Sequence, residues 1–313
     1  MLKRTRSFLV LVMLLMTVTM SAQVTTATMS GKVTAQDEPI IGATIVAIHE
    51  PSGTRYGTVT NVSGQFNLQG MRTGGPYKVE ISYVGYQTAI YKGINLLLGE
   101  NYVLNVSLKE SSELLDEVVV TASKESNMKS DRAGAIMNAN RDMISNTPTI
   151  SRSISDIMRL SPQGADVGNG FAVGGGNYRQ SFVTVDGAAF NNTFGLGGNL
   201  PANGSPISLD ALEQVTVAVT PFDVRQSGFT GGAINAVTRS GDNQFRGTAY
   251  MYFNNENLKG SKVDDYELLR SKAQYYTYGA SFGGPIIKDK LFFFVNGEYE
   301  DNVTAGSNYR PRT

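Results

Sequence analysis

Residues 291–300 read Leu-Phe-Phe-Phe-Val-Asn-Gly-Glu-Tyr-Glu, and this stretch decides the fold. Side chains along a strand point alternately to its two faces. One face here collects Leu291, Phe293, Val295 and Tyr299, and the other collects Asn296, Glu298 and Glu300. A transmembrane β-strand needs about 9–11 residues, and an apolar face backed by a polar face is typical of outer-membrane barrels. Alternation alone leaves a soluble sandwich open as the alternative.

Two earlier segments repeat the pattern, residues 245–254 and residues 275–284. The first places Phe245, Ala249, Met251 and Phe253 opposite Arg246, Thr248, Tyr250, Tyr252 and Asn254. The second places Tyr276, Tyr278, Ala280 and Phe282 together. We therefore predict three barrel strands within residues 242–313.

The connections between these segments favour the barrel. Residues 255–274 are twenty in number with eight charges, whereas residues 285–290 are only six. Long outer loops and short periplasmic turns distinguish outer-membrane barrels. Three strands cannot close a barrel. We therefore expect the first strands of a transmembrane β-barrel that continues in a longer protein.

The composition excludes several classes of site. The chain of 313 residues has no cysteine and one histidine, and its Lys+Arg and Asp+Glu totals are both 27. Cysteine-based zinc, iron–sulfur and disulfide sites are therefore excluded, and no basic excess indicates nucleic acid. His49 precedes Glu50 and Pro51, without an identifiable serine or carboxylate partner, and is interpreted as a surface or turn residue. We expect no catalytic residues, metal or other cofactor.

Residues 1–22 have the pattern of a signal peptide. Lys3, Arg4 and Arg6 precede a short apolar run, and Ser21-Ala22 forms a small-residue cleavage site. The run is too short for a membrane-spanning helix, which needs about 20 residues. No other long apolar stretch follows.

Residues 23–110 predict a small β-sandwich. Short alternating segments are separated by turn residues, as at 78–83 and 102–108, where Leu104, Val106 and Leu108 share a face. Turns are expected at 51–53, 63–64 and 74–76, because glycine and proline gather there.

Residues 111–135 are rich in charge and serine and predict a linker. The linker contains one β-prone run, composed of Asp116, Glu117, Val118, Val119, Val120, Thr121 and Ala122. Such a run suits β-augmentation, in which a strand pairs with a partner protein through main-chain hydrogen bonds. The alternative is an internal strand of the neighbouring domain.

Residues 136–241 predict a small α/β domain with many glycines. Short strands are expected at 171–173, 182–186, 215–220 and 233–238. Residues 151–160 fit a short helix capped by Ser151 or Ser153, with Ile154, Ile157 and Met158 on one face. No phosphate-binding glycine motif is present, so the glycines indicate compact loops packed close to a wall.

Several motifs resemble known families. Residues 30–34 (SGKVT), 39–44 (PIIGAT), 61–66 (NVSGQF) and 81–86 (ISYVGY) resemble the carboxypeptidase-regulatory-like domain, a non-catalytic, transthyretin-like sandwich. Residues 183–187 (VTVDG) and 228–239 (GFTGGAINAVTR) resemble the plug of TonB-dependent receptors. Residues 220–226 (TPFDVRQ) replace the frequent Arg-Gly-Pro of that plug, as in the SusC/Oar branch.

The resemblance implies a fold that is mainly β: a transthyretin-like sandwich, a small α/β plug and the beginning of a transmembrane β-barrel of about 22 strands. It identifies residues 116–122 as a TonB box, placed with the sandwich in the periplasm, and TonB as the partner. Outer-membrane lipid and a substrate-delivering surface lipoprotein are the other partners that it suggests. Substrate would contact the plug loops through Asn177, Tyr178, Arg179, Phe190, Asn191 and Asn192. The alternative is that the polar groups of these loops hydrogen-bond the barrel wall.

The predicted function is energised uptake of a bulky solute, such as a glycan, peptide or metal chelate, across the outer membrane of a Gram-negative bacterium. The alternative is a secreted or surface glycan-binding protein or adhesin that performs no transport.

Overall fold

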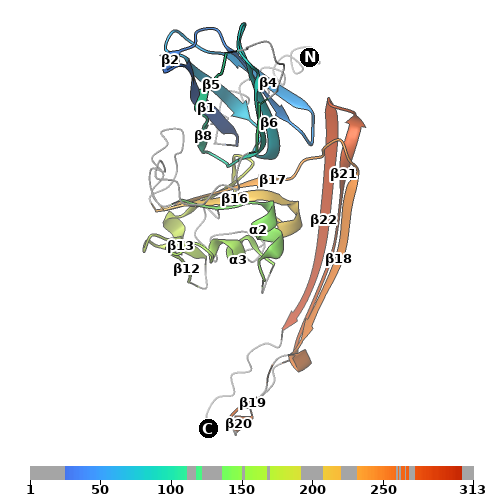
Figure 1. Cartoon of the computed structure of the whole chain (residues 1–313). Helices are drawn as coiled ribbons and strands as arrows, with labels where there is room; N and C mark the ends of the chain where they lie inside the picture. The colour runs from blue at the N-terminus through green and yellow to red at the C-terminus, as the bar shows by residue number, and fades with distance from the viewer. Residues whose placement is uncertain are drawn as a thin grey trace, which may run out of the picture.

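The computed structural model describes residues 25–110, 118–121, 136–149, 152–167, 170–191, 207–219, 231–258, 260, 262–264, 266–267 and 272–304. These residues form a mainly β structure, as predicted. A sandwich lies at one end, a central α/β unit follows, and three long strands run alongside both (Figure 1). The predicted signal peptide, Asp116, Glu117, Ala122 and Asn192 lie outside the described residues.

The sandwich has two five-stranded sheets. The first has the order β2-β1-β5, with β8 and β9 pairing in parallel with β1. Its strands are β1 (Ala27–Ala35), β2 (Glu38–Pro39), β5 (Gln65–Met71), β8 (Asn101–Val103) and β9 (Val106–Ser107). The second has the order β10-β7-β6-β3-β4. Its strands are β3 (Thr44–His49), β4 (Thr54–Val59), β6 (Gly74–Ser82), β7 (Ala89–Leu96) and β10 (Val118–Thr121).

Alternating side chains of the two sheets form one apolar core. Ile45, Val79 and Ile81 of the second sheet are fully buried in the same cluster as Met29 and Val33 of the first. The predicted face of Leu104, Val106 and Leu108 is confirmed, because all three side chains are buried. The core contains no metal ligand or disulfide, so apolar burial stabilises the sandwich.

Residues 74–76 do not form the expected turn and instead begin β6. Gly74 pairs with Leu96, so the chain is already part of the sheet at this point. A Cβ atom at Gly75 would lie 2.6 Å from the carbonyl oxygen of Ile94, so glycine is required by the close approach of the neighbouring strand. The propensity of glycine and proline for turns is overridden by this strand contact.

His49 lies at the end of β3, directly before a turn, as expected, but it is not a surface residue. Its side chain is only 4% exposed, its Nδ1 lies 2.7 Å from the Ser52 Oγ, and its ring centroid lies 5.0 Å from that of Tyr77. Ser52 is itself fully buried, and its Oγ also lies 2.8 Å from the Thr54 hydroxyl. Burial, assisted by the Arg72 charge, lowers the pKa of His49 to about 4.

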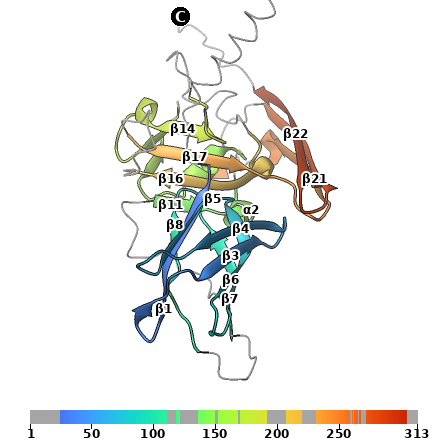
Figure 2. The ribbon, with the colours of Figure 1, turned by 90° about the horizontal axis from the view of Figure 1, so that it is seen from above.

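The central unit has a five-stranded sheet of order β11-β16-β17-β14-β15 (Figure 2). The strands are β11 (Ile136–Ala139), β14 (Phe182–Val185), β15 (Ala188–Ala189), β16 (Leu212–Ala218) and β17 (Ala233–Thr238). A separate hairpin joins β12 (Gly164–Asp166) to β13 (Phe171–Val173). All four predicted strands occur at or near the expected positions, whereas β11, β12 and β15 were not predicted.

Two short helices, α2 (Arg141–Asn146) and α3 (Ile154–Met158), pack beside this sheet (Figure 1). Ser153 is the N-cap of α3, and its backbone N–H donates to the Asp156 carboxylate. The predicted face of Ile154, Ile157 and Met158 is buried in the core of the central unit. None of the helices in the described part of the chain is long and apolar enough to cross a membrane.

The three long strands are β18 (Arg246–Asn255), β21 (Ala273–Ile287) and β22 (Leu291–Thr304), in antiparallel order β18-β21-β22. The last two are longer than the ten predicted residues, and the turn between them is correspondingly shorter, at residues 288–290. A small hairpin of β19 (Lys262–Val263) and β20 (Tyr266–Glu267) lies in the loop between β18 and β21.

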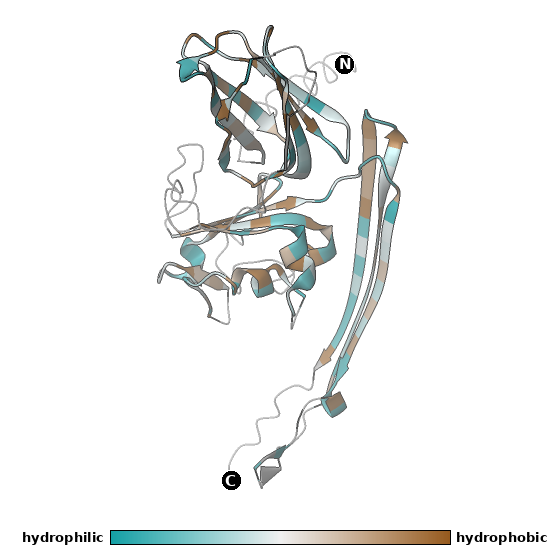
Figure 3. Cartoon of the chain, in the orientation of Figure 1, coloured by the Kyte–Doolittle hydropathy of each residue, from teal (hydrophilic) through white to brown (hydrophobic). Residues whose placement is uncertain are grey.

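The predicted alternation of faces is confirmed by the register. Met251 lies opposite Tyr278, which lies opposite Tyr299, and these side chains are 59%, 45% and 65% exposed. The adjacent residues Tyr250, Gly279 and Glu298 lie on the opposite face of the sheet. Figure 3 shows the resulting apolar and polar bands along the strands.

Aromatic rings gather at two levels of the exposed apolar face. Phe245, Phe282 and Phe293 lie together near the short turn, and Phe253, Tyr276 and Tyr278 lie together near the long loop. Phe245 and Phe253 are eight residues apart, which is about 27 Å along a strand. An apolar band of about 25 Å between aromatic girdles is the pattern of a lipid-facing barrel wall.

We expect the stability of the sandwich to fall as the pH is lowered from 6.5 towards 4. The folded state holds the pKa of His49 near 4, so only the unfolded state takes up a proton in this range. A fragment of residues 23–110 should fold alone, and its free energy of unfolding should fall between pH 7 and pH 5 because of His49. The lone histidine gives one set of imidazole NMR signals, which reports its pKa directly. The His49→Gln variant should lose this part of the pH dependence, and a pKa of 6.5 in the folded fragment would contradict the assignment.

Candidate functional site: the contact between the central unit and the long strands

The polar inner face of the three long strands contacts the central unit. Tyr250 of β18 and Glu298 of β22 lie side by side on this face, because each is opposite Gly279 in the register. A Cβ atom at Gly279 would lie 2.1 Å from the Tyr250 ring, so the ring occupies the space that a side chain would fill. Tyr250 donates a hydrogen bond to Glu298, and the two form one polar group.

Ser208 of the central unit binds this polar group directly. Its Oγ lies 2.9 Å from the Tyr250 hydroxyl and 3.1 Å from Glu298 Oε2. Ser208 is also the N-cap of a 3₁₀ turn, Leu209–Ala211, and accepts a hydrogen bond from the Asp210 N–H. The same residue therefore shapes its own loop and joins that loop to the long strands.

Arg152 makes the second contact. Its guanidinium carbon lies 4.1 Å from the centroid of the Tyr252 ring and 4.8 Å from that of Tyr250. Stacking of a guanidinium on tyrosine faces is a favourable cation–π arrangement, strongest where water is excluded. The other side of the arginine forms an ion pair with Asp210 at 2.6 Å.

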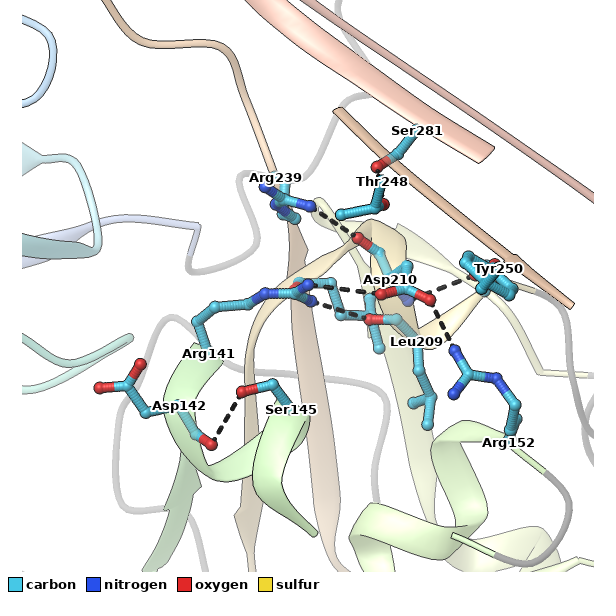
Figure 4. Close-up of polar contacts among 12 residues, drawn as sticks. Arg141, Asp142, Ser145, Arg152, Leu209, Asp210, Arg239, Thr248, Tyr250 and Ser281 are labelled. Carbon is cyan, nitrogen blue, oxygen red and sulfur yellow. Dashed lines mark hydrogen bonds and ion pairs between the residues drawn. The ribbon is translucent and has the colours of Figure 1, made fainter. Parts of the chain in front are cut away.

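Asp210 is the centre of an arginine cluster, shown in Figure 4. Its carboxylate pairs with Arg152 and, at 3.4 Å, with Arg141, and its backbone carbonyl accepts from Arg239. Arg141 also donates to the Leu212 carbonyl. The Asp210 side chain is 19% exposed, so these ion pairs are only partly screened by water.

Sequence reasoning missed this cluster. Arg152 and Asp210 are 58 positions apart, and Arg141 and Asp210 are 69 apart, so no local pattern joins them. The one available signal was Ser208 followed two residues later by Asp210, the pattern of a capped turn before a strand.

The predicted Asp-Gly element has a clear structural role. Asp186 and Gly187 both have positive φ, 48° and 82°, as the tight turn between β14 and β15 requires. The Asp186 carboxylate accepts hydrogen bonds from the backbone and hydroxyl of Thr238, at 2.9 and 2.6 Å. The turn is therefore attached to the end of β17.

The described residues predicted to contact substrate come together at the start of β14. Asn177 caps a 3₁₀ turn, Tyr178–Gln180, by accepting from the Arg179 N–H at 3.0 Å. Arg179 Nε donates to the Tyr178 hydroxyl at 3.1 Å, so these two side chains lie against each other. Asn177 and Arg179 are exposed and Tyr178 is half-buried.

Asn191 and Phe190 have structural contacts. The Asn191 amide accepts from the Val183 N–H at 2.6 Å and donates to the Ser181 carbonyl at 2.8 Å. Phe190 packs on the core of the central unit. These contacts hold the loop to β14 and place it beside Asn177–Gln180.

The β-prone run lies on the sandwich. Val118–Thr121 forms β10 and pairs in parallel with β7, with Val119 opposite Ile90 and Thr121 opposite Lys92. The pairing corresponds to the alternative left open by the sequence, a strand of the neighbouring domain. The pairing of β10 with β7 does not test whether the same residues also pair with a partner protein.

A polar cavity of about 130 Å³ lies where the sandwich, the central unit and the long strands meet. Four arginines from the three parts line it, namely Arg72, Arg141, Arg239 and Arg246. Glu213 also lines it, and burial raises the pKa of its carboxyl while the neighbouring arginines oppose the rise. Burial lowers the pKa of Arg239. The junction of the three parts is therefore lined by charged and polar groups rather than by an apolar surface.

Comparison with known proteins supplies the family context. Residues 28–109 match the carboxypeptidase regulatory-like domain, and residues 237–311 match an outer membrane beta barrel domain. The TonB-dependent transporter Oar of Myxococcus xanthus is 31% identical over 152 residues, covering 46% of this chain and 14% of Oar. The TonB-dependent receptor SusC of Bacteroides thetaiotaomicron is 28% identical over 281 residues, covering 85% of this chain and 26% of SusC.

The matches support a TonB-dependent receptor of the SusC/Oar type.

This agrees with the resemblance drawn from the sequence motifs. The relatives are transporters and receptors rather than enzymes, and the barrel match supports an outer-membrane location. The chain spans about a quarter or less of the length of these relatives. Among solved structures, the siderophore receptor PirA from Acinetobacter baumannii aligns with a TM-score of 0.42 and 20% identity, over 53% of this chain and 24% of PirA.

We expect Asp210→Asn to lower the free energy of unfolding of the central unit. The change removes the charge that pairs with two arginines and should lower stability by about 1–3 kcal/mol, since those arginines remain partly buried. A cysteine at fully buried Ala139 in the full-length receptor reports the urea concentration that exposes the core. Asp142→Asn is the matched control, because Asp142 is exposed on the first turn of α2. Equal urea profiles for the two variants would show that the cluster contributes no stability.

Proposed function

We propose that the protein is a TonB-dependent transporter that takes up a bulky solute across the outer membrane. One observation supports the proposal: the long strands expose an apolar face with two aromatic levels, while Ser208 and Arg152 of the central unit contact their polar face. A sheet that faces lipid on one side and a folded domain on the other suits a plugged barrel. We accordingly interpret the central unit, residues 136–241, as the plug.

A plug must move for a bulky solute to pass. The contacts that hold this plug to the wall are hydrogen bonds and a cation–π stack, rather than a large apolar surface. Polar contacts can be exchanged for water at modest free-energy cost, whereas an apolar interface resists separation. The wall contact therefore suits a domain that is rearranged in each transport cycle. No bond in the solute is broken in such a cycle, so no catalytic residue is required.

TonB is the proposed source of energy, acting on residues 116–122. The valine-rich run lies between the sandwich and the plug in the chain, so a pull on it reaches the plug through the linker. The sandwich and this run would lie in the periplasm, where the inner-membrane partner can reach them.

The turn at Asn177–Gln180 and the neighbouring Phe190–Asn191 loop are the proposed substrate contacts. Tyr178 and Arg179 offer an aromatic face and hydrogen-bond donors for a glycan, a peptide or a metal chelate. Asn191 positions the loop through its contacts with β14. Asn192 is included on the sequence resemblance alone, and a surface lipoprotein that delivers substrate is a further proposed partner.

Uptake by the full-length receptor tests the proposal. Cells expressing it are offered labelled oligosaccharides, peptides and ferric chelates, with and without TonB, to find an imported class. Val119→Pro should then abolish uptake and leave surface binding intact, because proline removes a backbone donor from the strand. Asn127→Pro is the control in the charged, serine-rich part of the linker. Binding without import of any class would instead favour a surface adhesin.

We also expect the long loop to lie outside the cell and the short turn inside. The sandwich contacts the strands at the short-turn end, where the Asn243 N–H donates to the Pro51 carbonyl at 3.0 Å (Figure 1). Lys262 and Lys288 are exposed residues of the loop and the turn, and the chain has no native cysteine. In intact cells an impermeant maleimide should label Lys262→Cys and not Lys288→Cys. The opposite labelling pattern would invert the orientation, and equal labelling would exclude the barrel.

A further inference from the structure

The parallel pairing of β10 with β7 makes the proposed TonB box part of a folded sheet. Four consecutive residues pair in register, from Val118 with Ala89 to Thr121 with Lys92. The resulting sheet order is β10-β7-β6-β3-β4, so β10 occupies its edge. Among the described strands, β10 pairs only with β7.

An edge strand has one hydrogen-bonding side inside the sheet and one side that faces outward. The outward side presents a row of backbone N–H and carbonyl groups with fixed spacing, which is a template for another strand. Peptide recognition by strand addition uses such edges, and the added strand gains its affinity from main-chain hydrogen bonds. The outward edge of β10 is therefore a preformed docking edge.

We propose that TonB adds a β-strand to the outward edge of β10 while β10 stays on β7. The inference rests on the proposed coupling function of residues 116–122. The surface recognised by TonB is then the edge of the sandwich sheet, enlarged to six strands in the complex, rather than a free peptide.

β10 is expected to stay in the sheet because its removal from β7 would break backbone pairing and expose buried side chains. Displacement would break the pairing of four residues and open the edge of β7 at Ala89 and Ile90, which are only 8% and 4% exposed. Addition to the outer edge breaks nothing and binds a strand that is already ordered. Preorganisation of this kind improves affinity because less conformational entropy is lost on binding.

The chain order allows force transmission with β10 still attached. The sandwich precedes β10, and the plug follows it, so a pull on β10 loads the linker to the plug whether or not β10 is paired with β7. The sandwich itself is held to the rest by polar contacts, such as Asn138 with Glu100 and Arg72 with the Gly241 carbonyl. The sandwich can therefore separate from the rest of the structure and move together with β10 when β10 is pulled.

A reversible crosslink between the paired strands tests the inference. Lys92→Cys and Thr121→Cys are combined in the full-length receptor, whose sequence has no cysteine of its own. Oxidation should join them within one chain. The oxidised receptor should then bind the periplasmic domain of TonB and import solute as the reduced receptor does, at a ratio of about one.

The control combines Thr121→Cys with Val59→Cys, which is exposed on β4 at the opposite edge of the same sheet. This pair should give no intramolecular crosslink. Absence of the crosslink between positions 92 and 121 would overturn the inference. The inference would also be overturned if oxidation abolished TonB binding and reduction restored it. Failure of the proposed function is separately visible, because the unmodified receptor would then show no TonB-dependent uptake.

Discussion

The strict two-residue alternation of β18, β21 and β22 is the constraint on which the rest of the structure depends. A strand that faces lipid on one side must place every polar side chain on the other, since lipid offers no hydrogen bonds. Tyr250, Tyr252 and Glu298 therefore face inward together, and the central unit meets them with Ser208 and Arg152. A shift of one residue in the register would expose these polar groups to lipid and leave Arg152 against Met251 and Phe253.

Features that depend on local pattern were predictable from the sequence. The two faces of the long strands follow from alternation, and the buried face of α3 follows from the spacing of Ile154, Ile157 and Met158. Features that depend on partners distant in the chain were not. The burial of His49 and the arginines around Asp210 result from the packing of separate segments, and the start of β6 at Gly74 results from pairing with Leu96. For the substrate loops, the sequence suggested the positions but could not distinguish the exposed Arg179 from Asn191, whose amide is bonded to β14.

The sandwich and the central unit differ in how they are stabilised and how they are attached. Each has its own apolar core, and neither core includes residues of the other. Their junction contains hydrogen bonds and a charged cavity, with Arg72 and Glu213 contributed from opposite sides. Cores of this kind let each domain remain folded while the contact between them is broken, because the contact itself buries little apolar surface.

The edge position of β11 determines where the central sheet is mechanically weakest. β11 is the first described element after β10, and it pairs with β16 through only four residues, Ile136–Ala139. The sheet strands β16 and β17 run across the direction of β21 and β22, so a load along the long strands acts across β11 rather than along it (Figure 1). Under such a load the hydrogen bonds between β11 and β16 would break one after another, beginning at Ile136. A load along β11 would instead strain all of these bonds at the same time, in shear. β17, which continues into β18, would stay anchored to the wall, and the sheet would come apart from one side only.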